Sequence, residues 1–334
     1  MQQPRTMTRK EALEKGGMLA GAAALGLLGI APRSTYAATT GAALGVHAGN
    51  VQWGSTGSLD NYSSLVGRKP SLIHVFMAFY NNGGFRHVLL SGLNTLQNRY
   101  PGSVIMLTWE PRGGPVTLDS IIAGTHDGYI RGEARTMKAF GKRLLLRPFH
   151  EMNLTAYPWG RQNPRYKLIN AWRKMRSLFN AEGAWNVQWV WCPNVAAPLS
   201  PASPPLRDFY PGDAYVDWLG LDGYNWGGSR NFPWYQFYQI FKPSYDQLSA
   251  IGGPRKIIIA EVACDTRGGD KALWFRNMRS QIKASFPRIW GVCYFNIYDE
   301  GANWPVNTSS GSLTAYKEMV ADPYYQVSLA ARPF

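Results

Sequence analysis

Eight short runs of apolar and β-branched residues recur along this chain, and they constrain its fold more than any other feature. Most are nearly continuous in hydrophobicity, which is the pattern of strands buried on both faces of a parallel sheet. The runs are Ala43–His47, Leu72–Phe79, Val104–Glu110, Arg143–Phe149, Val187–Cys192, Trp218–Asp222, Lys256–Ala263 and Trp290–Ile297. This pattern predicts an α/β fold with helices covering the sheet.

The segments between these runs are long enough for crossover helices. Pro164–Glu182 is the clearest case, because its apolar residues fall on one helical stripe. Helices are also expected over Gly84–Tyr100, Gly124–Gly141, Trp234–Ile251 and Asp270–Phe286. Strands and helices alternating in this way predict a single (β/α)8 TIM barrel. An open doubly wound sheet is the alternative, but no glycine-rich fingerprint follows the first run.

The N-terminal residues have the layout of a cleavable, twin-arginine-like signal peptide. Arg9-Lys10 precedes an apolar stretch that runs to Ile30, and a small residue, Ala37, ends the segment. We therefore expect a secreted or cell-wall-associated protein with no membrane insertion after cleavage. The expected organisation is a signal peptide over residues 1–37, a barrel domain over 38–324 and a C-terminal tail over 325–334.

The charge balance is basic, with a formal net charge of +14 for the whole chain. Residues 1–37 contain five basic and two acidic residues, so the remainder carries a formal charge of +11. The basic residues are dispersed, without a Lys/Arg run or a zinc-finger spacing, so we expect no nucleic-acid partner. The three cysteines lie in or beside apolar runs, which predicts buried thiols and leaves one disulfide open; they are Cys192, Cys264 and Cys293.

The chain is rich in aromatic residues, with 13 Trp, 18 Tyr and 14 Phe. Each indole carries an N–H that needs a partner when it is buried, so a core of this many tryptophans is awkward to build. A cleft lined with aromatic faces, on which the apolar faces of sugars stack, is the other interpretation.

Polar residues gather where the predicted strands end, which is the face of a barrel that holds its active site. Two glutamates are the most informative. Glu151 follows Leu144-Leu145-Leu146, and Glu261 follows Ile257-Ile258-Ile259-Ala260. Two carboxylates after apolar strands on opposite sides of a barrel fit glycoside hydrolysis, which needs an acid and a second carboxylate. The alternative is that each glutamate pairs structurally with an arginine, such as Arg147 or Arg267.

At this point the chain resembles glycoside hydrolase family 26. Arg147-Pro148-Phe149-His150-Glu151-Met152-Asn153 is similar to the acid/base motif of that family, and Ile258-Ile259-Ala260-Glu261 is similar to its nucleophile strand. The block from Tyr210 to Asn225 resembles its sixth-strand region. The resemblance covers nearly the whole chain after residue 37. It implies a retaining endo-β-glycanase of the mannanase or mixed-linkage glucanase type, with no metal and no cofactor.

The resemblance also implies roles for individual residues. Glu151 would be the acid/base and Glu261 the nucleophile, with His150 beside the sugar and Tyr224 orienting Glu261. Further candidate substrate-binding or supporting residues are Arg147, Asn153, Asn225 and His47. Among the tryptophans, Trp159 and Trp304 are the ones expected to stack on sugar.

One departure from the family pattern leaves the substrate open. Mannanases of the family have a glycine after the motif's asparagine and then a Trp-Trp pair, whereas Leu154-Thr155-Ala156-Tyr157-Pro158-Trp159-Gly160 stands here. The expected partner is a β-linked polysaccharide, with mannan, mixed-linkage glucan and xylan all open, and we expect a monomer.

Other classes of function fit less well. A carbohydrate-binding protein without catalysis would need neither glutamate. The five histidines have no metal-binding spacing. Gly54-Ser55-Thr56-Gly57-Ser58 is not a Gly-x-Ser-x-Gly elbow and is interpreted as a loop.

Overall fold

A computed structural model describes residues 40–49, 54–196, 203–251 and 253–331 of the chain. The predicted signal peptide lies outside these residues, as does part of the proline-rich loop that follows Val195. Among the described residues, none of the helices combines the length and hydrophobicity that crossing a bilayer requires.

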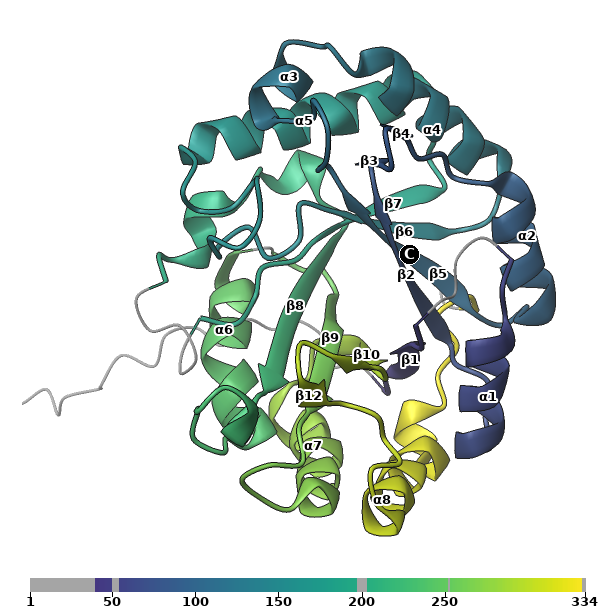
Figure 1. Ribbon diagram of the computed structural model, residues 1–334, viewed down its shortest axis with the longest axis vertical. Helices are drawn as coiled ribbons and strands as arrows, with labels where there is room; N and C mark the ends of the chain where they lie inside the picture. The colour runs from purple at the N-terminus through teal and green to yellow at the C-terminus, as the bar shows by residue number, and fades with distance from the viewer. Residues whose placement is uncertain (1–39, 50–53, 197–202, 252, 332–334) are drawn as a thin grey trace, which may run out of the picture. The chain divides into compact units, whose positions relative to one another are not determined.

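Eight parallel strands close into a barrel, as predicted (Figure 1). The first strand, β1, pairs with β2 on one side and with β10 on the other, which closes the sheet. The ends differ from the predicted ones by at most three residues. The strands are β1 (Ala43–His47), β2 (Leu72–Ala78), β5 (Val104–Glu110), β6 (Leu144–Pro148), β7 (Val187–Trp191), β8 (Trp218–Asn225), β9 (Ile257–Cys264) and β10 (Ile289–Phe295).

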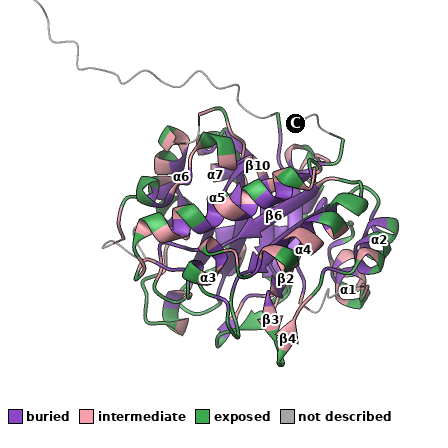
Figure 2. Cartoon of the chain, turned by 90° about the horizontal axis from the view of Figure 1, so that it is seen from above, coloured by how far each residue is buried: buried purple, intermediate pink, exposed green. Residues whose placement is uncertain are grey.

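Helices surround the barrel and bury its outer face, while their own outer faces are exposed (Figures 1 and 2). The prediction for Pro164–Glu182 is confirmed, because Pro164 and Glu182 flank α5. The predicted helix over Gly84–Tyr100 begins only at Leu90, since residues 84–85 form a short strand. The helices are α1 (Gly57–Val66), α2 (Leu90–Arg99), α3 (Leu118–Ile122), α4 (Asp127–Ala139), α5 (Arg165–Ala181), α6 (Phe237–Ile251), α7 (Lys271–Ser285) and α8 (Ser310–Ala321).

Shorter elements decorate the barrel. Two antiparallel pairs follow strands of the barrel: β3 (Tyr80–Asn81) with β4 (Gly84–Phe85), and β11 (Tyr298–Asp299) with β12 (Ala302–Asn303). The 3-10 helices are η1 (Leu206–Phe209), η2 (Asp213–Tyr215), η3 (Gly227–Ser229) and η4 (Pro323–Tyr325).

The barrel interior is filled by alternate residues of its strands. On β6, Leu145 belongs to the inner apolar cluster, whereas Leu144 and Leu146 pack outward against the helices. Side chains two residues apart on a strand point the same way, so Arg147 also points into the barrel. The three cysteines are buried and free, as expected for small apolar residues.

The predicted C-terminal tail is in part packed onto the barrel. Tyr325 and Leu329 are fully buried, and Gln326 forms a bridge with Ala43 at the start of β1. Arg143 donates to the carbonyl of Leu329 over 2.9 Å. These residues cover the N-terminal end of the barrel, because Leu329 joins the inner apolar cluster there.

Candidate active site

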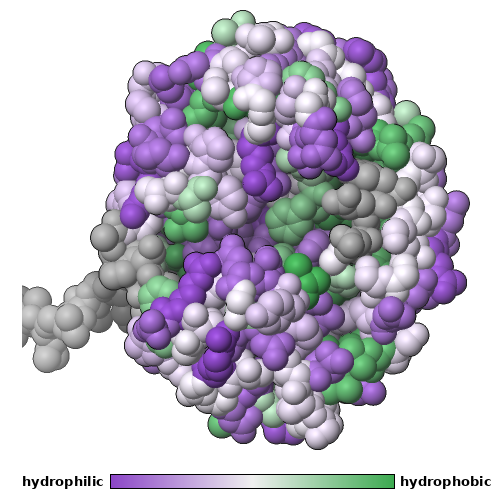
Figure 3. Space-filling model, viewed as in Figure 1, coloured by the Kyte–Doolittle hydropathy of each residue, from purple (hydrophilic) through white to green (hydrophobic). Residues whose placement is uncertain are grey.

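A cavity of about 750 Å³ opens at the C-terminal ends of the strands. Figure 3 shows this face of the molecule, which is hollowed near its centre where hydrophilic and hydrophobic side chains mix. Of the predicted site residues, six line the cavity: His47, His150, Glu151, Tyr224, Glu261 and Trp304.

A strained turn after β6 brings Glu151 into the cavity. Phe149 and Glu151 both have a positive φ, of 49° and 52°, which is costly for residues other than glycine. The turn is held by two hydrogen bonds, from the Glu151 N–H to the carbonyl of Cys192 (2.8 Å) and from Trp159 Nε1 to the carbonyl of His150 (2.7 Å). The surrounding structure therefore fixes the direction of the Glu151 carboxyl.

An irregularity in β9 turns Glu261 into the cavity. Ile258 and Ala260 point into the barrel, so simple alternation would turn the next residue outward. The pairing with β8 skips one residue here, because Leu221 pairs with Ile259 and Asp222 with Glu261. An extra residue of this kind re-aims the side chains that follow it. Glu261 therefore points into the barrel beside Asp222.

The two glutamates approach each other closely. One carboxylate oxygen from each of Glu151, Asp222 and Glu261 lies within 4.8 Å of the others. These three carboxyls are also the one group among the described residues with a spacing that suits a metal ion. A buried guanidinium, that of Arg147, already contacts Asp222 and Glu261 and supplies the positive charge.

Arg147 lies at the centre of the site's floor and is completely buried. It contacts Glu261, bonds Asp222 over 2.5 Å, donates to Thr108 Oγ1 over 2.7 Å and lies 3.1 Å from His74 Nε2. These five residues are called the floor cluster below. Burial and the adjacent Arg147 charge lower the pKa of His74 well below its usual value, so its ring is neutral.

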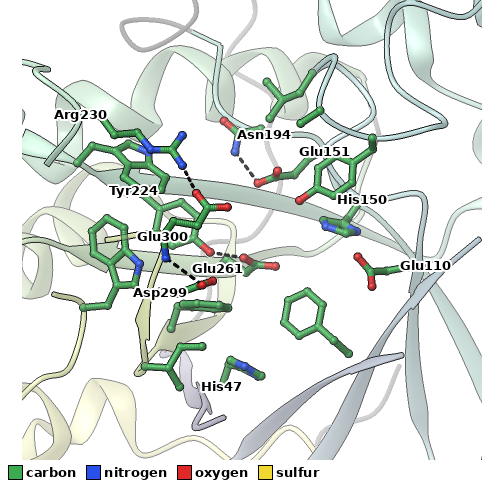
Figure 4. Close-up of a pocket in the computed structure, with 18 of the residues that line it drawn as sticks. His47, Glu110, His150, Glu151, Asn194, Tyr224, Arg230, Glu261, Asp299 and Glu300 are labelled. Atoms are coloured by element: carbon green, nitrogen blue, oxygen red, sulfur yellow. Dashed lines mark hydrogen bonds and ion pairs between the residues drawn. The ribbon is translucent and has the colours of Figure 1, made fainter. Parts of the chain in front are cut away.

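Glu261 is held from above as well, since the Tyr224 hydroxyl donates to its Oε2 (Figure 4). Burial and the nearby carboxylates raise the pKa of Tyr224, so the phenol keeps its proton. One oxygen of Glu261 thus faces Arg147 and the other faces Tyr224. The two donors therefore hold both oxygens of the Glu261 carboxyl in place.

Glu151 has a different environment. Burial and the nearby Glu261 charge raise its pKa to about 7, while a 2.6 Å hydrogen bond from Asn194 Nδ2 favours the ionised form. A hydrogen bond from the Tyr157 side chain also favours the ionised form of this carboxyl. Near neutral pH Glu151 therefore holds a proton that it can give up.

The two histidines of the cavity are neutral. Burial and the Arg147 charge lower the pKa of His150 well below the usual value, and its ring packs against Tyr157 at 4.6 Å. Burial lowers the pKa of His47, whose Nδ1 lies 3.1 Å from the carbonyl of His74. Neutral imidazoles can donate or accept hydrogen bonds from sugar hydroxyls without adding charge.

Four predicted site residues lie outside the cavity lining. Trp159 was expected to stack on sugar, but it is buried and lies parallel to Tyr157 at 4.9 Å. The indole N–H of Trp159 donates to the turn that follows β6, so Trp159 supports that turn. Arg147 contacts Glu261 and Asp222 from beneath the cavity, within the floor cluster. The alternative, that each glutamate pairs with an arginine, is met for Glu261, which contacts Arg147. Glu151 instead accepts a hydrogen bond from Asn194, and Arg267 pairs with Asp265.

The two predicted asparagines hold neighbouring groups. Asn153 exchanges two hydrogen bonds with the backbone of Asn194, of 2.9 and 2.8 Å, and so positions the residue that contacts Glu151. Asn225 lies 3.3 Å from Cys264 Sγ and accepts from the backbone N–H of Tyr235 over 3.2 Å. Both asparagine side chains are engaged in contacts within the protein, so they are not free to bind sugar.

Sequence reasoning missed several residues of the site. Asn194 and Asp222 stand at predicted strand ends, so their position was a usable signal. Glu110 also ends a strand; its pKa is raised by burial, and it pairs with Arg112 over 2.9 Å. Other residues, which come from loops, carried no signal; they are Tyr157, Arg230, Phe232, Asp299 and Glu300.

Known proteins resemble this chain in sequence and in fold. The sequence model of glycosyl hydrolase family 26 matches residues 128–317. Endoglucanase H of Acetivibrio thermocellus is 34% identical over 276 residues, which cover 80% of this chain and 29% of that protein. A mannan endo-1,4-beta-mannosidase of Bacillus subtilis is 28% identical over 188 residues, covering 53% of this chain and 44% of that protein. The chain thus spans less than half of the length of either relative.

Solved structures share the fold. The catalytic domain of an endo-β-1,4-mannanase from Bacillus sp. JAMB-750 superposes with a TM-score of 0.66 at 19% identity, covering 87% of this chain and 88% of that one. A Cellulomonas fimi endo-β-1,4-mannanase gives a TM-score of 0.65 at 18% identity, covering 88% and 77%. At this level of sequence identity the solved structures support the barrel fold alone. The family assignment rests on the sequence matches. The chain belongs to glycosyl hydrolase family 26, a family of glycosidases.

Proposed function

We propose that this chain hydrolyses a β-linked polysaccharide with retention of configuration, with Glu151 as acid/base and Glu261 as nucleophile. One observation carries the proposal: the two buried carboxyls approach within 4.8 Å, yet their surroundings differ. Retaining glycosidases keep their carboxyls about 5–5.5 Å apart, whereas inverting enzymes need roughly 6.5–9.5 Å to admit a water.

In the first step the protonated Glu151 gives its proton to the glycosidic oxygen as the bond to the anomeric carbon breaks. The Glu261 carboxylate attacks that carbon from the opposite face and forms a glycosyl-enzyme ester. The pKa of about 7 for Glu151 suits proton donation near neutral pH. Arg147 and Tyr224 hold the Glu261 carboxyl in the position from which it attacks.

In the second step the now ionised Glu151 removes a proton from water, which attacks the anomeric carbon and releases Glu261. Loss of the ester restores both carboxyls to their starting forms. Asn194 donates to Glu151 and stabilises the carboxylate that exists between the two steps. The same residue therefore serves as acid and then as base.

A β-1,4-linked or mixed-linkage glucan is the first candidate substrate, and β-mannan is the second. Endoglucanase H matches over 80% of this chain, more than the mannan endo-1,4-beta-mannosidase of Bacillus subtilis at 53%. The aromatic rings in the cavity lining, among them Trp226 and Trp304, suit the apolar faces of either sugar.

We further propose that the chain is exported and acts as a monomer. The layout of residues 1–37 supports export. Mass spectrometry of the mature N-terminus from a bacterial host, with sedimentation of the purified protein, tests both points. An intact leader on extracellular protein, or a dimer, would contradict them.

The test of activity is reducing-sugar release from barley mixed-linkage glucan, glucomannan, galactomannan and xylan. Glu151→Ala and Glu261→Ala should each lower the rate by roughly a thousandfold or more, because each removes a reacting group. The anomer released first, read by NMR, reports retention. Activity that survives in either variant, or an inverted first product, would overturn the assignment.

A further inference from the structure

An ion pair crosses the rim of the cavity between two loops that are distant in sequence. Arg230 follows η3, after β8, and Glu300 lies at the tip of the hairpin formed by β11 and β12. Arg230 Nη2 contacts Glu300 Oε2, and both residues line the cavity (Figure 4). Arg230 and Glu300 are called the rim pair below. Neither residue was predicted to belong to the site.

The guanidinium of Arg230 lies on an aromatic ring. Its Cζ is 3.8 Å from the centre of the Trp226 ring, which is contact distance for a stacked cation. Trp226 in turn packs against Trp304 at 4.8 Å and Tyr224 at 5.5 Å. Since Tyr224 donates to Glu261, one aromatic wall leads from the nucleophile to Arg230.

The hairpin that carries Glu300 has a firm base. Arg267 donates to the carbonyl of Gly301 over 2.6 Å, and the N–H of Asn303 donates to Asp265 over 2.7 Å. Glu300 and Gly301 both have positive φ, of 50° and 74°, the conformation that tight two-residue hairpins require. The position of the Glu300 carboxylate is therefore set by the fold.

Most of the Arg230 donors are not used by the protein. A guanidinium has five N–H groups in one plane. Among the described residues, Glu300 is the one acceptor that the Arg230 side chain bonds. The Trp226 ring below the guanidinium and the Glu300 carboxylate beside it fix the plane of the guanidinium. The N–H groups that Glu300 does not use are therefore available at the cavity wall.

We propose that Arg230 is a substrate-binding residue that contacts the hydroxyls of a sugar unit away from the one held between Glu151 and Glu261. This inference rests on the proposed function. Glu300 neutralises the charge of Arg230, so the pair suits a neutral hexose with many hydroxyls. A lysine cannot replace the arginine fully, because an ammonium has no planar fork.

The experiment compares kinetics on oligosaccharides of increasing length, from the dimer to the hexamer, of the sugar that the polymer assay identifies. Arg230→Ala should raise KM roughly five- to tenfold on the longer substrates and leave kcat unchanged. On the shortest substrate that the enzyme cleaves, both KM and kcat should be unchanged. The KM of Arg230→Lys on the longer substrates should lie between the values for the wild type and for Arg230→Ala. Arg276→Ala is the matched control, because Arg276 also pairs with a glutamate and is also 45% exposed.

The outcomes separate this inference from the proposed function. An equal effect of Arg230→Ala at every length, or no effect, would overturn the role of Arg230 while leaving the hydrolase in place. If the wild type cleaves none of the four polymers, the proposed function fails. Binding of the β-1,4-linked hexamers of glucose and of mannose, followed by tryptophan fluorescence, then decides on Arg230, and equal affinity of variant and wild type for both hexamers would refute its role.

Discussion

Two arginines contact carboxylates at this cavity, and their surroundings differ. Arg147 in the floor cluster is fully buried and contacts Glu261 and Asp222. Arg230 in the rim pair is 45% exposed and contacts Glu300, which is 54% exposed. Water screens the rim pair, so it contributes little to stability, whereas each buried charge of the floor cluster depends on its partner.

The difference teaches what each pair can do. In the floor cluster the geometry is enforced from all sides, so Arg147 can hold the Glu261 carboxyl in one position. At the rim the Trp226 ring and Glu300 hold Arg230 while leaving N–H groups at the cavity wall. We propose that the same pairing of arginine with carboxylate serves positioning at the floor and recognition at the rim.

Removing the buried arginine should have the largest effect. Arg147→Met leaves Glu261 and Asp222 without their partner, so we expect a loss of about 3–5 kcal/mol in the free energy of unfolding and a fall of roughly a hundredfold or more in kcat. Urea denaturation and steady-state kinetics measure both. Arg147→Lys, which keeps the charge, should recover part of the stability. A variant as stable and active as the wild type would show that Arg147 has no such role.

Removing the second donor to Glu261 should have a smaller effect. Tyr224→Phe keeps the ring and deletes the hydroxyl that donates to Oε2. Because a hydrogen bond to a charged group is worth about 1.5–3 kcal/mol, we expect a ten- to hundredfold loss of kcat with little change in KM. Tyr316→Phe, at a buried phenol away from the cavity, is the control. A change in KM alone would mean that Tyr224 binds substrate instead.

The pH dependence of kcat/KM should shift when Asn194 is changed. Glu151 must be protonated for the first step, so activity should fall as the pH rises through its pKa of about 7. The hydrogen bond from Asn194 favours the ionised form, so Asn194→Ala should raise the pKa and move the alkaline limb to higher pH. Gln247→Ala, remote from the cavity, should leave the profile unchanged. A shift to lower pH would contradict this role of the bond.

Breaking the rim pair should have the smallest effect on stability. Glu300→Gln removes a charge from an exposed ion pair, so the free energy of unfolding should change by less than about 1 kcal/mol. Thermal or urea denaturation of the variant beside Arg147→Met makes the comparison direct. A loss as large as that of the floor cluster would mean that the rim loops are part of the barrel's stability.

The sequence predicted the scaffold of the site well. Continuous apolar runs identify buried strands, and the rule that sites lie at strand ends located Glu151 and Glu261. Helix starts were less accurate; Gly84–Phe85 became a hairpin strand because the loop after β2 folds back there. The sequence shows which polar and charged residues follow each strand, whereas it does not show how the loops between the elements fold.

The direction of the side chains was decided by tertiary structure alone. Alternation would turn Glu261 away from the cavity, and only the pairing of β9 with β8 shows the extra residue that turns it inward. Trp159 and Trp304 are equally aromatic in the sequence, yet one supports a turn and the other lines the cavity.

By itself the sequence determined the barrel, the order of its strands and the family, because these depend on local periodicity and on motifs of adjacent residues. The raised pKa of Glu151, the burial of Arg147 and the meeting of the rim loops depend on the tertiary structure. Arg230 and Glu300 stand 70 residues apart, and no local pattern records that their loops touch. Burial and pKa depend on every neighbour in space, and those neighbours exist only once the chain has folded.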